Sequence, residues 1–320
     1  MKIAHFGVKP WEVEYLKNNL NTQQEQLFFE QDNIPNDLES MADIQVLSVF
    51  IHTNLGKNIL EKLPNLDLIL TRSTGFDHID IEYAKENNIQ VYNVPGYGSN
   101  TVAEHTFALL LSISKQIFNQ ANRSKEFNFR FEDNLGFDLH SKTIGVIGAG
   151  KIGKNTIQIA RGFDMKAIAF DIYKDEFAAE VAGFRYVEIE EILATSDILT
   201  LHTPLNDFTK NILSRENLLK LKPGAVFLNT SRGGLISNEN LLFALENGIF
   251  AYAGLDAIEG EENLFKGLVD PTQQKILNHP KVLYTPHSAF YTKEAVTRII
   301  QTTIDNYNNF QSHNSNNKVT

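Results

Sequence analysis

The chain of 320 residues is too long for one ordinary domain and fits two, and its 42% hydrophobic content is enough to bury a sizeable core. A formal net charge of −10 argues against nucleic acid as a partner, because the chain and a phosphate backbone repel each other. The absence of cysteine excludes disulfides, thiolate metal sites and cysteine nucleophiles, so the chemistry must use other side chains.

Membrane and export signals are missing from the sequence pattern. No apolar run approaches the roughly 18 residues that span a bilayer. The first residues also lack the long apolar stretch of a secretion signal. We therefore expect a cytoplasmic protein without membrane contact, and no grouping of residues predicts a metal site.

From Lys2 onward, short apolar runs rich in β-branched residues alternate with segments of helical period. This alternation predicts an α/β fold in which crossover helices connect parallel strands. In the first third, the pattern predicts strands over 3–7, 44–50, 66–71 and 89–94, and helices that include 12–20 and 81–86. These elements would form one small open-sheet domain.

The segment 101–118 is apolar nearly all round, as in a helix that is covered on several sides and that bridges domains or subunits. A second series of strands is predicted over 143–147, 166–170, 198–201, 225–228, 250–254 and 282–284. Six strands are the number that a full dinucleotide-binding sheet requires. Residues 293–310 predict a last helix, and we expect the polar residues 313–320 to form a frayed tail.

A cofactor signature lies in residues 143–153, TIGVIGAGKIG, where a β-branched strand runs into G-x-G-x-x-G at the start of a helix. Gly148 would permit the tight turn, Gly150 the approach of a pyrophosphate, and Gly153 close packing of helix on strand. Asp171 ends the next strand about 18 residues later, where an acid that binds ribose hydroxyls is expected. The motif predicts NAD rather than NADP, although Lys174 weakens that preference; a tight turn in another kind of α/β protein is the alternative.

Polar side chains follow three strands of the second series, at the sheet edge where open α/β sheets bind ligands. Arg232 follows AVFLNTS, an acidic cluster follows AYAGLDAI, and His287 follows VLYTP. Reduction of a carbonyl beside a carboxylate needs a fixed cation and a proton donor, which an arginine and a histidine supply. A carboxylate bound to the histidine would favour its protonated form, and Glu259, Glu261 and Glu262 compete for that role. Taken singly, these residues are more often a solvated arginine, a structural histidine and an exposed acidic turn.

Seven segments make the sequence resemble the D-isomer-specific 2-hydroxyacid dehydrogenase family, and within it the D-lactate dehydrogenases, over nearly the whole chain. They are STGFDHID (73–80), NVPGYGSNTVAEHT (93–106), TIGVIGAGKIG (143–153), LHTPL (201–205), LNTSRGGLI (228–236), AGLDAIEGEENLF (253–265) and TPHSAFYT (285–292). The resemblance implies that Arg232 binds the substrate carboxylate and that His287 is the acid and base. It selects Glu261 as the partner of His287, so that Glu259 and Glu262 are expected to be solvated.

The resemblance also implies the binding residues. Those for the cofactor NAD are Gly148, Gly150, Lys151, Ile152, Gly153, Asp171, His202, Thr203, Pro204, Thr209, Thr230, Ser231, Arg232 and Asp256. Asp256 would accept a hydrogen bond from the nicotinamide carboxamide. Those for the substrate are Thr74, Gly75, Tyr97, Arg232 and Phe290, the first two through their backbone amides.

The architecture that the resemblance implies has two open parallel-sheet domains. Residues 1–97 and 290–320 would form a flavodoxin-like substrate domain, and residues 98–289 a Rossmann-type NAD-binding domain. The helix over 101–118 would form part of a homodimer interface.

The function that follows is NAD-dependent reduction of pyruvate to D-lactate and its reverse. Hydroxypyruvate, glyoxylate or bulkier 2-oxo acids stay open as substrates, because Gly96 is smaller than the residue in many D-lactate dehydrogenases. Formate dehydrogenases share the fold but pair the histidine with glutamine, so Glu261 argues against that activity. A non-enzymatic, NAD-sensing protein that resembles the corepressors of this family is an alternative of another class.

Overall fold

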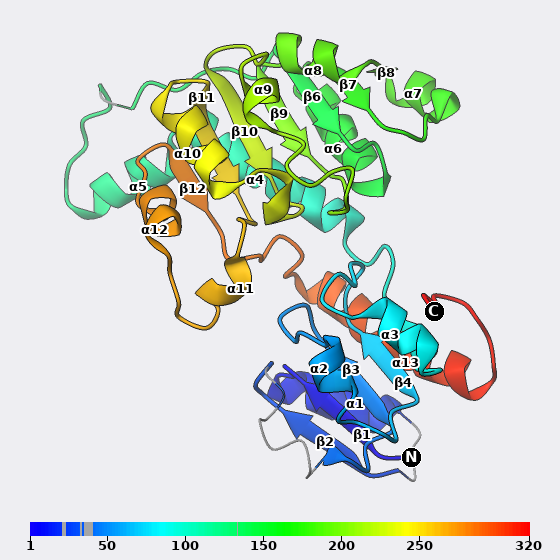
Figure 1. The fold of residues 1–320 in the computed structure, drawn as a ribbon. Coiled ribbons are helices and arrows are strands. Elements are labelled where there is room, and N and C mark those ends of the chain that lie inside the picture. Colours follow the sequence, from blue (N-terminus) through cyan, green and yellow to red (C-terminus); the bar gives the residue numbers. More distant parts are fainter. Residues whose placement is uncertain (21–23, 33, 35–40, 133) are drawn as a thin grey trace. The chain divides into compact units, whose positions relative to one another are not determined.

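The computed structural model describes residues 1–20, 24–32, 34, 41–132 and 134–320. The described chain divides into two compact units (Figure 1): a first unit of Met1–Tyr97 with Thr292–Thr320, and a second unit of Gly98–Tyr291. Each unit is built on one parallel sheet, of five strands in the first and seven in the second. The predicted fold class, α/β with two open parallel sheets, is therefore confirmed.

The sheet of the first unit has the strand order β2-β1-β3-β4-β5, which is the flavodoxin-like order. Its strands are β1 (Ile3–Phe6), β2 (Gln26–Phe29), β3 (Val46–Val49), β4 (Leu68–Thr71) and β5 (Gln90–Tyr92). The sequence analysis missed β2. All four residues of this strand are half-buried, because β2 lies at the edge of the sheet, so it shows neither a buried apolar run nor strict alternation.

The helices of the first unit are α1 (Pro10–Asn19), α2 (Lys57–Leu60), α3 (Ile81–Glu86) and α13 (Lys293–Gln311). One core cluster joins the sheet to the segments that contain α2 and α3, through residues such as Leu60 and Ala84. Helix α13 contacts β4 and α1 and buries an apolar stripe that includes Ile299, Ile300 and Ile304. The helix that completes this unit therefore comes from the other end of the chain.

The expected frayed tail is wrong, because the last residues pair with the sheet of the first unit. Lys318 forms an antiparallel bridge with Tyr92, and the Val319 amide donates to the Val91 carbonyl oxygen at 2.8 Å. The Val91 amide in turn donates to Thr320 Oγ1 at 2.9 Å. Edge strand β5 exposes backbone groups that need partners, and this short segment supplies them.

The sheet of the second unit has the order β12-β11-β10-β9-β6-β7-β8, which is the Rossmann order extended by one strand. Its strands are β6 (Thr143–Ile147), β7 (Lys166–Phe170), β8 (Arg185–Tyr186), β9 (Ile198–Leu201), β10 (Ala225–Asn229), β11 (Phe250–Leu255) and β12 (Val282–Tyr284). Seven strands replace the expected six. The missed strand, β8, has two residues and is too short to give a periodic signal.

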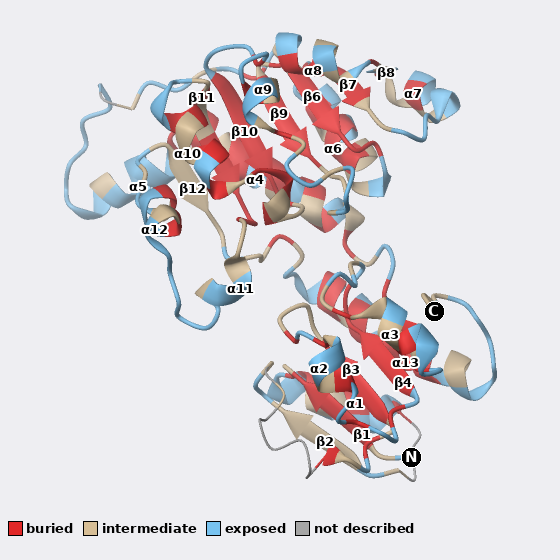
Figure 2. Ribbon diagram, in the orientation of Figure 1, coloured by how far each residue is buried: buried red, intermediate tan, exposed pale blue. Residues whose placement is uncertain are grey.

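Two hydrophobic cores cover the two faces of this sheet, and Figure 2 shows its central strands as buried. Val146 packs in the core with α4 and α6, whereas Ile147 packs in the core with α8 and α10, as the alternation of strand side chains requires. The helices are α4 (Ser99–Ser114), α5 (Ile117–Lys125), α6 (Lys151–Gly162), α7 (Glu176–Ala182), α8 (Ile189–Thr195), α9 (Arg215–Leu218), α10 (Asn238–Glu246), α11 (Glu261–Leu264) and α12 (Pro271–Leu277). Within the described residues, no helix combines the length and apolarity needed to cross a membrane.

The expected continuous helix over 101–118 is broken in the structure. Helix α4 ends at Ser114, Gln116 adopts a left-handed φ of 52°, and α5 starts at Ile117. Ile117 and Phe118, which sequence analysis placed on the buried helix, are more than half exposed. The apolar run predicts one continuous helix, because the periodicity of side chains does not reveal a break caused by a single left-handed residue.

Candidate active site

The predicted site residues of the second unit lie at the carboxyl ends of its strands. Gly148 follows β6, Asp171 follows β7, His202 follows β9, Arg232 follows β10, and His287 follows β12. All seven strands run parallel, so their carboxyl ends share one edge of the sheet. The strand order reverses between β6 and β9, and ligands of open α/β sheets bind at such a switch point.

The glycine loop between β6 and α6 has the geometry that a pyrophosphate needs. Gly148 has a φ of 97°, and a Cβ atom there would lie 2.6 Å from the backbone of His202. Gly153 is equally constrained, since a Cβ atom would lie 2.1 Å from the carbonyl oxygen of Gly148. Gly150, at the start of the 12-residue helix α6, has open space where its Cβ atom would be. The loop therefore fits a dinucleotide, with the helix N-terminus toward its phosphates.

Asp171 is tied to this loop from the neighbouring strand end. Its Oδ2 accepts the backbone N–H of Ala149 at 2.7 Å, and its Oδ1 accepts that of Tyr173 at 3.0 Å. The carboxylate is half-buried next to the glycine turn. It is therefore held beside the glycine turn, at the place where the sequence predicts an acid that accepts ribose hydroxyls.

His202 is a half-buried histidine whose ring is held by two threonines. Its Nε2 lies 3.2 Å from Thr156 Oγ1 on α6 and 3.1 Å from Thr200 Oγ1 on β9. Burial lowers its pKa to about 3, so the ring is neutral at physiological pH. The backbone of His202, rather than a charged ring, adjoins the glycine loop at Gly148.

Hydrogen bonds also fix the remaining cofactor candidates. Thr209 Oγ1 donates to the carbonyl oxygen of Pro204 at 2.6 Å and closes the loop after β9. Ser231 Oγ donates to the carbonyl oxygen of Thr203 at 2.6 Å, which links the loops after β9 and β10. Lys151 and Ile152 begin α6, as the motif predicts.

Arg232 lies in the loop after β10, and its backbone is held in place. Asn229 Nδ2 donates to the Arg232 carbonyl oxygen at 2.9 Å, and Arg232 Nη1 donates to that of Ser231 at 3.0 Å. The next residue, Gly233, packs so closely on the loop after β11 that a Cβ atom would lie 2.0 Å from the Ile258 carbonyl carbon. The loop that carries Arg232 therefore touches the loop that leads to Glu261.

His287 and Glu261, which the sequence analysis expects to be partners, lie in hydrogen-bonding contact. His287 Nδ1 lies 2.6 Å from Glu261 Oε1, and both side chains are largely buried, with 16% and 17% of their surfaces exposed. Burial, and then the negative charges of Glu261 and Asp256, raises the pKa of Tyr284 beyond its usual range. The Tyr284 phenol therefore stays protonated next to these carboxylates.

Asp256 is almost fully buried and holds the turn that carries His287. Its Oδ1 accepts the Thr285 hydroxyl at 2.5 Å and the Ser288 amide at 2.9 Å, and its Oδ2 accepts the Ala289 amide at 2.8 Å. The sequence analysis gave Asp256 only a nicotinamide contact. The carboxylate thus has a structural duty that the motif does not reveal.

The expectation for Glu259 is wrong, because this side chain is half-buried and bonded. Its Oε2 accepts the backbone N–H of Asn238 at 3.1 Å, at the start of α10, where a negative charge is favourable. Its carbonyl oxygen accepts hydrogen bonds from the side chains of Asn238 and Gln273. Glu262 is exposed, as expected.

The predicted substrate residues are divided between the units. Thr74 Oγ1 donates to the Val94 carbonyl oxygen at 2.9 Å in the first unit, and Ser73 Oγ donates to that of Gly75 at 2.6 Å. The carbonyl oxygen of Tyr97 accepts Arg298 Nε at 2.6 Å. Phe290 belongs to the second unit and packs edge-on against Tyr291.

Sequence analysis did not single out His105, although it lies within the quoted motif 93–106. Its Nε2 is 2.9 Å from Thr285 Oγ1 and 3.5 Å from Asp256 Oδ1. The sequence does contain a signal for His105, because a histidine within a mostly apolar helix needs a polar partner. Among the described residues, no group of three or more histidine, aspartate and glutamate side chains could hold a metal ion.

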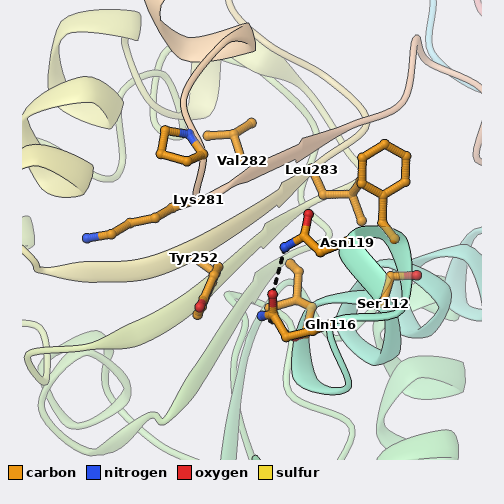
Figure 3. Close-up of a pocket in the computed structure, with 10 residues that line it drawn as sticks. Ser112, Gln116, Asn119, Tyr252, Lys281, Val282 and Leu283 are labelled. Atoms are coloured by element: carbon orange, nitrogen blue, oxygen red, sulfur yellow. Dashed lines mark hydrogen bonds between the residues drawn. The ribbon is translucent and has the colours of Figure 1, made fainter. Parts of the chain in front are cut away.

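Figure 3 shows a pocket that lies away from these residues, beside the corner between α4 and α5. Gln116, Asn119, Tyr252 and Lys281 are among the residues that line it, and Asn119 Nδ2 donates to Gln116 Oε1 at 2.8 Å. Lys281 precedes β12, so this pocket lies near the amino ends of the strands. It is therefore separate from the candidate active site at the carboxyl ends.

Comparisons with known proteins agree over nearly the whole chain. Residues 107–289 match the NAD-binding domain of the D-isomer-specific 2-hydroxyacid dehydrogenases. The chain is 32% identical to a D-lactate dehydrogenase of Escherichia coli strain K12, covering 97% of both chains. It is 33% identical to an aromatic 2-oxoacid reductase of Clostridium sporogenes strain ATCC 15579, covering 97% of this chain and 96% of the relative. The crystal structure of D-lactate dehydrogenase from Aquifex aeolicus, complexed with NAD and lactic acid, superposes with a TM-score of 0.91 at 31% identity and covers 99% of this chain and 98% of that one.

Proposed function

This chain belongs to the D-isomer-specific 2-hydroxyacid dehydrogenase family and binds NAD, and on that premise we propose that it is a D-lactate dehydrogenase. It converts pyruvate, NADH and a proton to D-lactate and NAD⁺, and it catalyses the reverse reaction. The observation that carries the proposal is the His287–Glu261 pair next to the loop of Arg232. These groups are the proton donor and the cation that reduction of a 2-oxo acid requires.

His287 moves the proton in this reaction. Its Nδ1 is bound to Glu261, so Nε2 is the nitrogen that gives a proton to the carbonyl oxygen during reduction. In the oxidation direction, neutral His287 takes the proton back from the hydroxyl group. Glu261 holds the ring orientation and stabilises the imidazolium form, because a charge-assisted hydrogen bond is strongest where solvent is largely excluded.

Arg232 holds the other end of the substrate. Its planar guanidinium can bind a carboxylate through two parallel hydrogen bonds, which orients the adjacent carbonyl and polarises it. The hydrogen bond from Asn229 to its backbone fixes the base of this side chain. When bound, NADH supplies the hydride for the carbonyl carbon, and the residues of the Gly148–Gly153 loop would hold its pyrophosphate.

We assign NAD to the second unit and most of the substrate contacts to the first. The family match over residues 107–289, which lies within the second unit, supports the first assignment. Thr74 and Gly75 are candidates for the substrate in the first unit, since the side chains of Ser73 and Thr74 already bond to the carbonyl oxygens of Gly75 and Val94 in that unit. Tyr97 and Phe290 are candidates for determining which 2-oxo acid is accepted.

A bulkier or aromatic 2-oxo acid is the second candidate substrate. It is favoured by the likeness to the aromatic 2-oxoacid reductase and by Gly96, an exposed glycine with a φ of 77° next to Tyr97. A small residue at this position leaves more room than the larger residue expected in a D-lactate dehydrogenase. The catalytic roles of Arg232, Glu261 and His287 are the same for both substrates.

The test is NADH oxidation at 340 nm with pyruvate, 2-ketobutyrate, glyoxylate, hydroxypyruvate, phenylpyruvate and 2-ketoisocaproate, followed by chiral analysis of the best product. The highest kcat/KM with pyruvate and a D product are expected. A preference for phenylpyruvate or 2-ketoisocaproate would replace the substrate and keep the mechanism. NADH binding without turnover of any 2-oxo acid would contradict the enzymatic function and favour an NAD-sensing protein.

We also propose that the chain is a homodimer. The segment from α5 onward exposes large apolar side chains, of which Phe127, Phe129 and Phe131 are each at least 75% exposed. Such a group of apolar side chains marks an interaction surface, and a second copy of the chain would cover it. Light scattering should give twice the monomer mass for the wild type, and replacement of the three phenylalanines by serine should give monomers. A monomeric wild type would contradict the proposal.

A further inference from the structure

We infer that His105 on helix α4 is a positioning residue for the acid–base histidine. Through Thr285 and Asp256 it fixes the turn that presents His287 to the substrate. This inference deepens the proposed function and rests on it. His105, Thr285, Asp256 and His287 all lie in the second unit.

The backbone of His287 is strained and needs support. Its φ is 49°, in the left-handed region that side chains other than glycine rarely adopt. A residue in this region is strained, and the strain persists only where the surroundings enforce it. The orientation of the imidazole therefore depends on the groups that hold this turn in place.

Asp256 is the residue that accepts the hydrogen bonds of this turn. The two amides that follow His287, those of Ser288 and Ala289, donate to its two carboxylate oxygens at 2.9 and 2.8 Å. The His287 amide itself donates to the Asp256 carbonyl oxygen at 2.9 Å. Three hydrogen bonds from consecutive amides thus converge on one residue, and its carboxylate is almost fully buried.

The hydrogen of the Thr285 hydroxyl decides how His105 takes part. Thr285 Oγ1 lies 2.5 Å from Asp256 Oδ1, an oxygen that also accepts the Ser288 amide, so the hydroxyl donates its single hydrogen there. At 2.9 Å from the same hydroxyl oxygen, His105 Nε2 must then be the donor. The chain of donors runs from His105 through Thr285 to Asp256, and each hydrogen bond polarises the next.

The anchoring of α4 does not depend on His105. The helix packs on α6 and on the sheet through apolar residues that include Phe107, Leu109 and Leu110. The residue next to His105, Thr106, bonds through its hydroxyl to Thr230 Oγ1 at 2.8 Å, in the loop after strand β10. Two adjacent side chains of α4 therefore reach two strand-end loops of the candidate site.

The test compares His105→Leu, which removes the donor, with His105→Gln, whose amide N–H can replace it. We expect His105→Leu to lower kcat for pyruvate by about tenfold, because a displaced acid–base group lowers the rate more than the binding. The KM for NADH should change less than twofold. His105→Gln should recover most of the lost rate.

Thr285→Val removes the hydroxyl at nearly constant volume and tests the same donor chain. If His105 acts through Thr285, the double variant should be no slower than the slower single variant, because coupled residues are not additive. Thr303→Val, which removes a buried hydroxyl from α13 in the first unit, is the matched control and should keep wild-type kcat. Additive losses, or a His105→Leu enzyme with wild-type kcat, would overturn the inference.

A measurement that needs no turnover separates this inference from the proposed function. In ¹⁵N-histidine-labelled protein, the proton shared by His287 Nδ1 and Glu261 should resonate far downfield at low temperature. We expect that signal to move or broaden in His105→Leu and to return in His105→Gln. An unchanged signal would contradict the positioning role even if the wild type reduced no 2-oxo acid, whereas a moved signal in an inactive protein would contradict only the proposed reaction.

Discussion

At the scale of single residues, the proposed role of Glu261 can be tested by removing its charge. Glu261→Gln keeps the size of the side chain but removes the charge that favours protonated His287 across a 2.6 Å contact. We expect kcat/KM for pyruvate to fall by tenfold or more, because the charge-assisted hydrogen bond to the proposed proton donor is lost. The measurement is the pH profile of kcat/KM for both enzymes, and superimposable profiles would remove Glu261 from its assigned role.

Arg232→Lys tests the fork geometry of the carboxylate contact at constant charge. A lysine cannot form two parallel hydrogen bonds with a carboxylate, and the loss of a charged hydrogen bond costs about 2 kcal/mol. We therefore expect kcat/KM for pyruvate to fall about 30-fold, with both KM and kcat affected. Arg185→Lys, at an exposed position of the second unit where the side chain pairs with Glu191, is the control and should leave the kinetics unchanged. Equal kinetics of the Arg232 variant and the wild type would require another residue to bind the carboxylate.

At the scale of elements, the β6–α6 turn contains glycines with two different roles: Gly150 leaves room for the cofactor, and Gly153 allows close packing. Gly150→Ala places a methyl group in open space, so the fold should be unaffected while the pyrophosphate loses its room, and we expect NADH affinity to fall at least tenfold. Gly153→Ala drives a methyl group against the Gly148 carbonyl oxygen and should lower the free energy of unfolding by about 1–3 kcal/mol. Far-UV circular dichroism in urea and NADH fluorescence measure the two effects, with Gly162→Ala as the control at another open position. An unstable Gly150→Ala with wild-type NADH affinity would reverse these assignments.

The elements that sequence analysis located are those with a buried face. Strands β6, β7 and β9 have the predicted limits, because their apolar residues face cores on both sides of a parallel sheet. The predicted limits of edge strand β12 are also correct, although its residues are only half-buried. Edge strand β2 and the two-residue strand β8 carry too little buried surface to give a pattern. The break after α4 depends on the left-handed backbone of Gln116, which local propensity does not reveal.

For the candidate site, the sequence predicted the residue types and their places at strand ends, but not their partners. It predicted the pairing of His287 with Glu261 only through the resemblance, because the two residues are brought together by different loops. It did not show that the Asp256 carboxylate binds backbone amides of the turn after His287, or that Glu259 binds the start of α10. Such contacts depend on side-chain directions that emerge only when the loops pack together.

At the scale of the whole molecule, we expect the stability of the first unit to depend on pH through a buried histidine. His5 in the first unit is fully buried against Phe28, and burial, followed by the charge of Arg72, lowers its pKa to about 3. The unfolded chain therefore takes up a proton near pH 6.5, before the folded chain does. The stability that depends on neutral His5 is present above pH 6.5 and is lost as the pH falls toward 3.

Unfolding of the first unit can be followed specifically within the full chain, because the single tryptophan, Trp11, lies on α1 of that unit. Urea unfolding followed by Trp11 fluorescence should show that wild type loses about 2 kcal/mol more than His5→Phe between pH 7 and pH 5. The phenylalanine keeps an aromatic ring against Phe28 and removes the titratable group. His313→Gln, at an exposed histidine of the same unit, should behave as wild type. Parallel losses in wild type and His5→Phe would show that His5 does not contribute to acid sensitivity.

The origin of α13 at the far end of the chain has a consequence for synthesis on the ribosome. The second unit is continuous in sequence, whereas the first unit waits for Thr292–Thr320. At about 5–20 residues per second, translation of the intervening segment takes on the order of 10–40 s. During that time the apolar surface that Ile299, Ile300 and Ile304 later cover is without its helix. The part of the protein that is made first is therefore the last to reach its native state, and nascent chains that stop before α13 leave a surface for chaperones to bind.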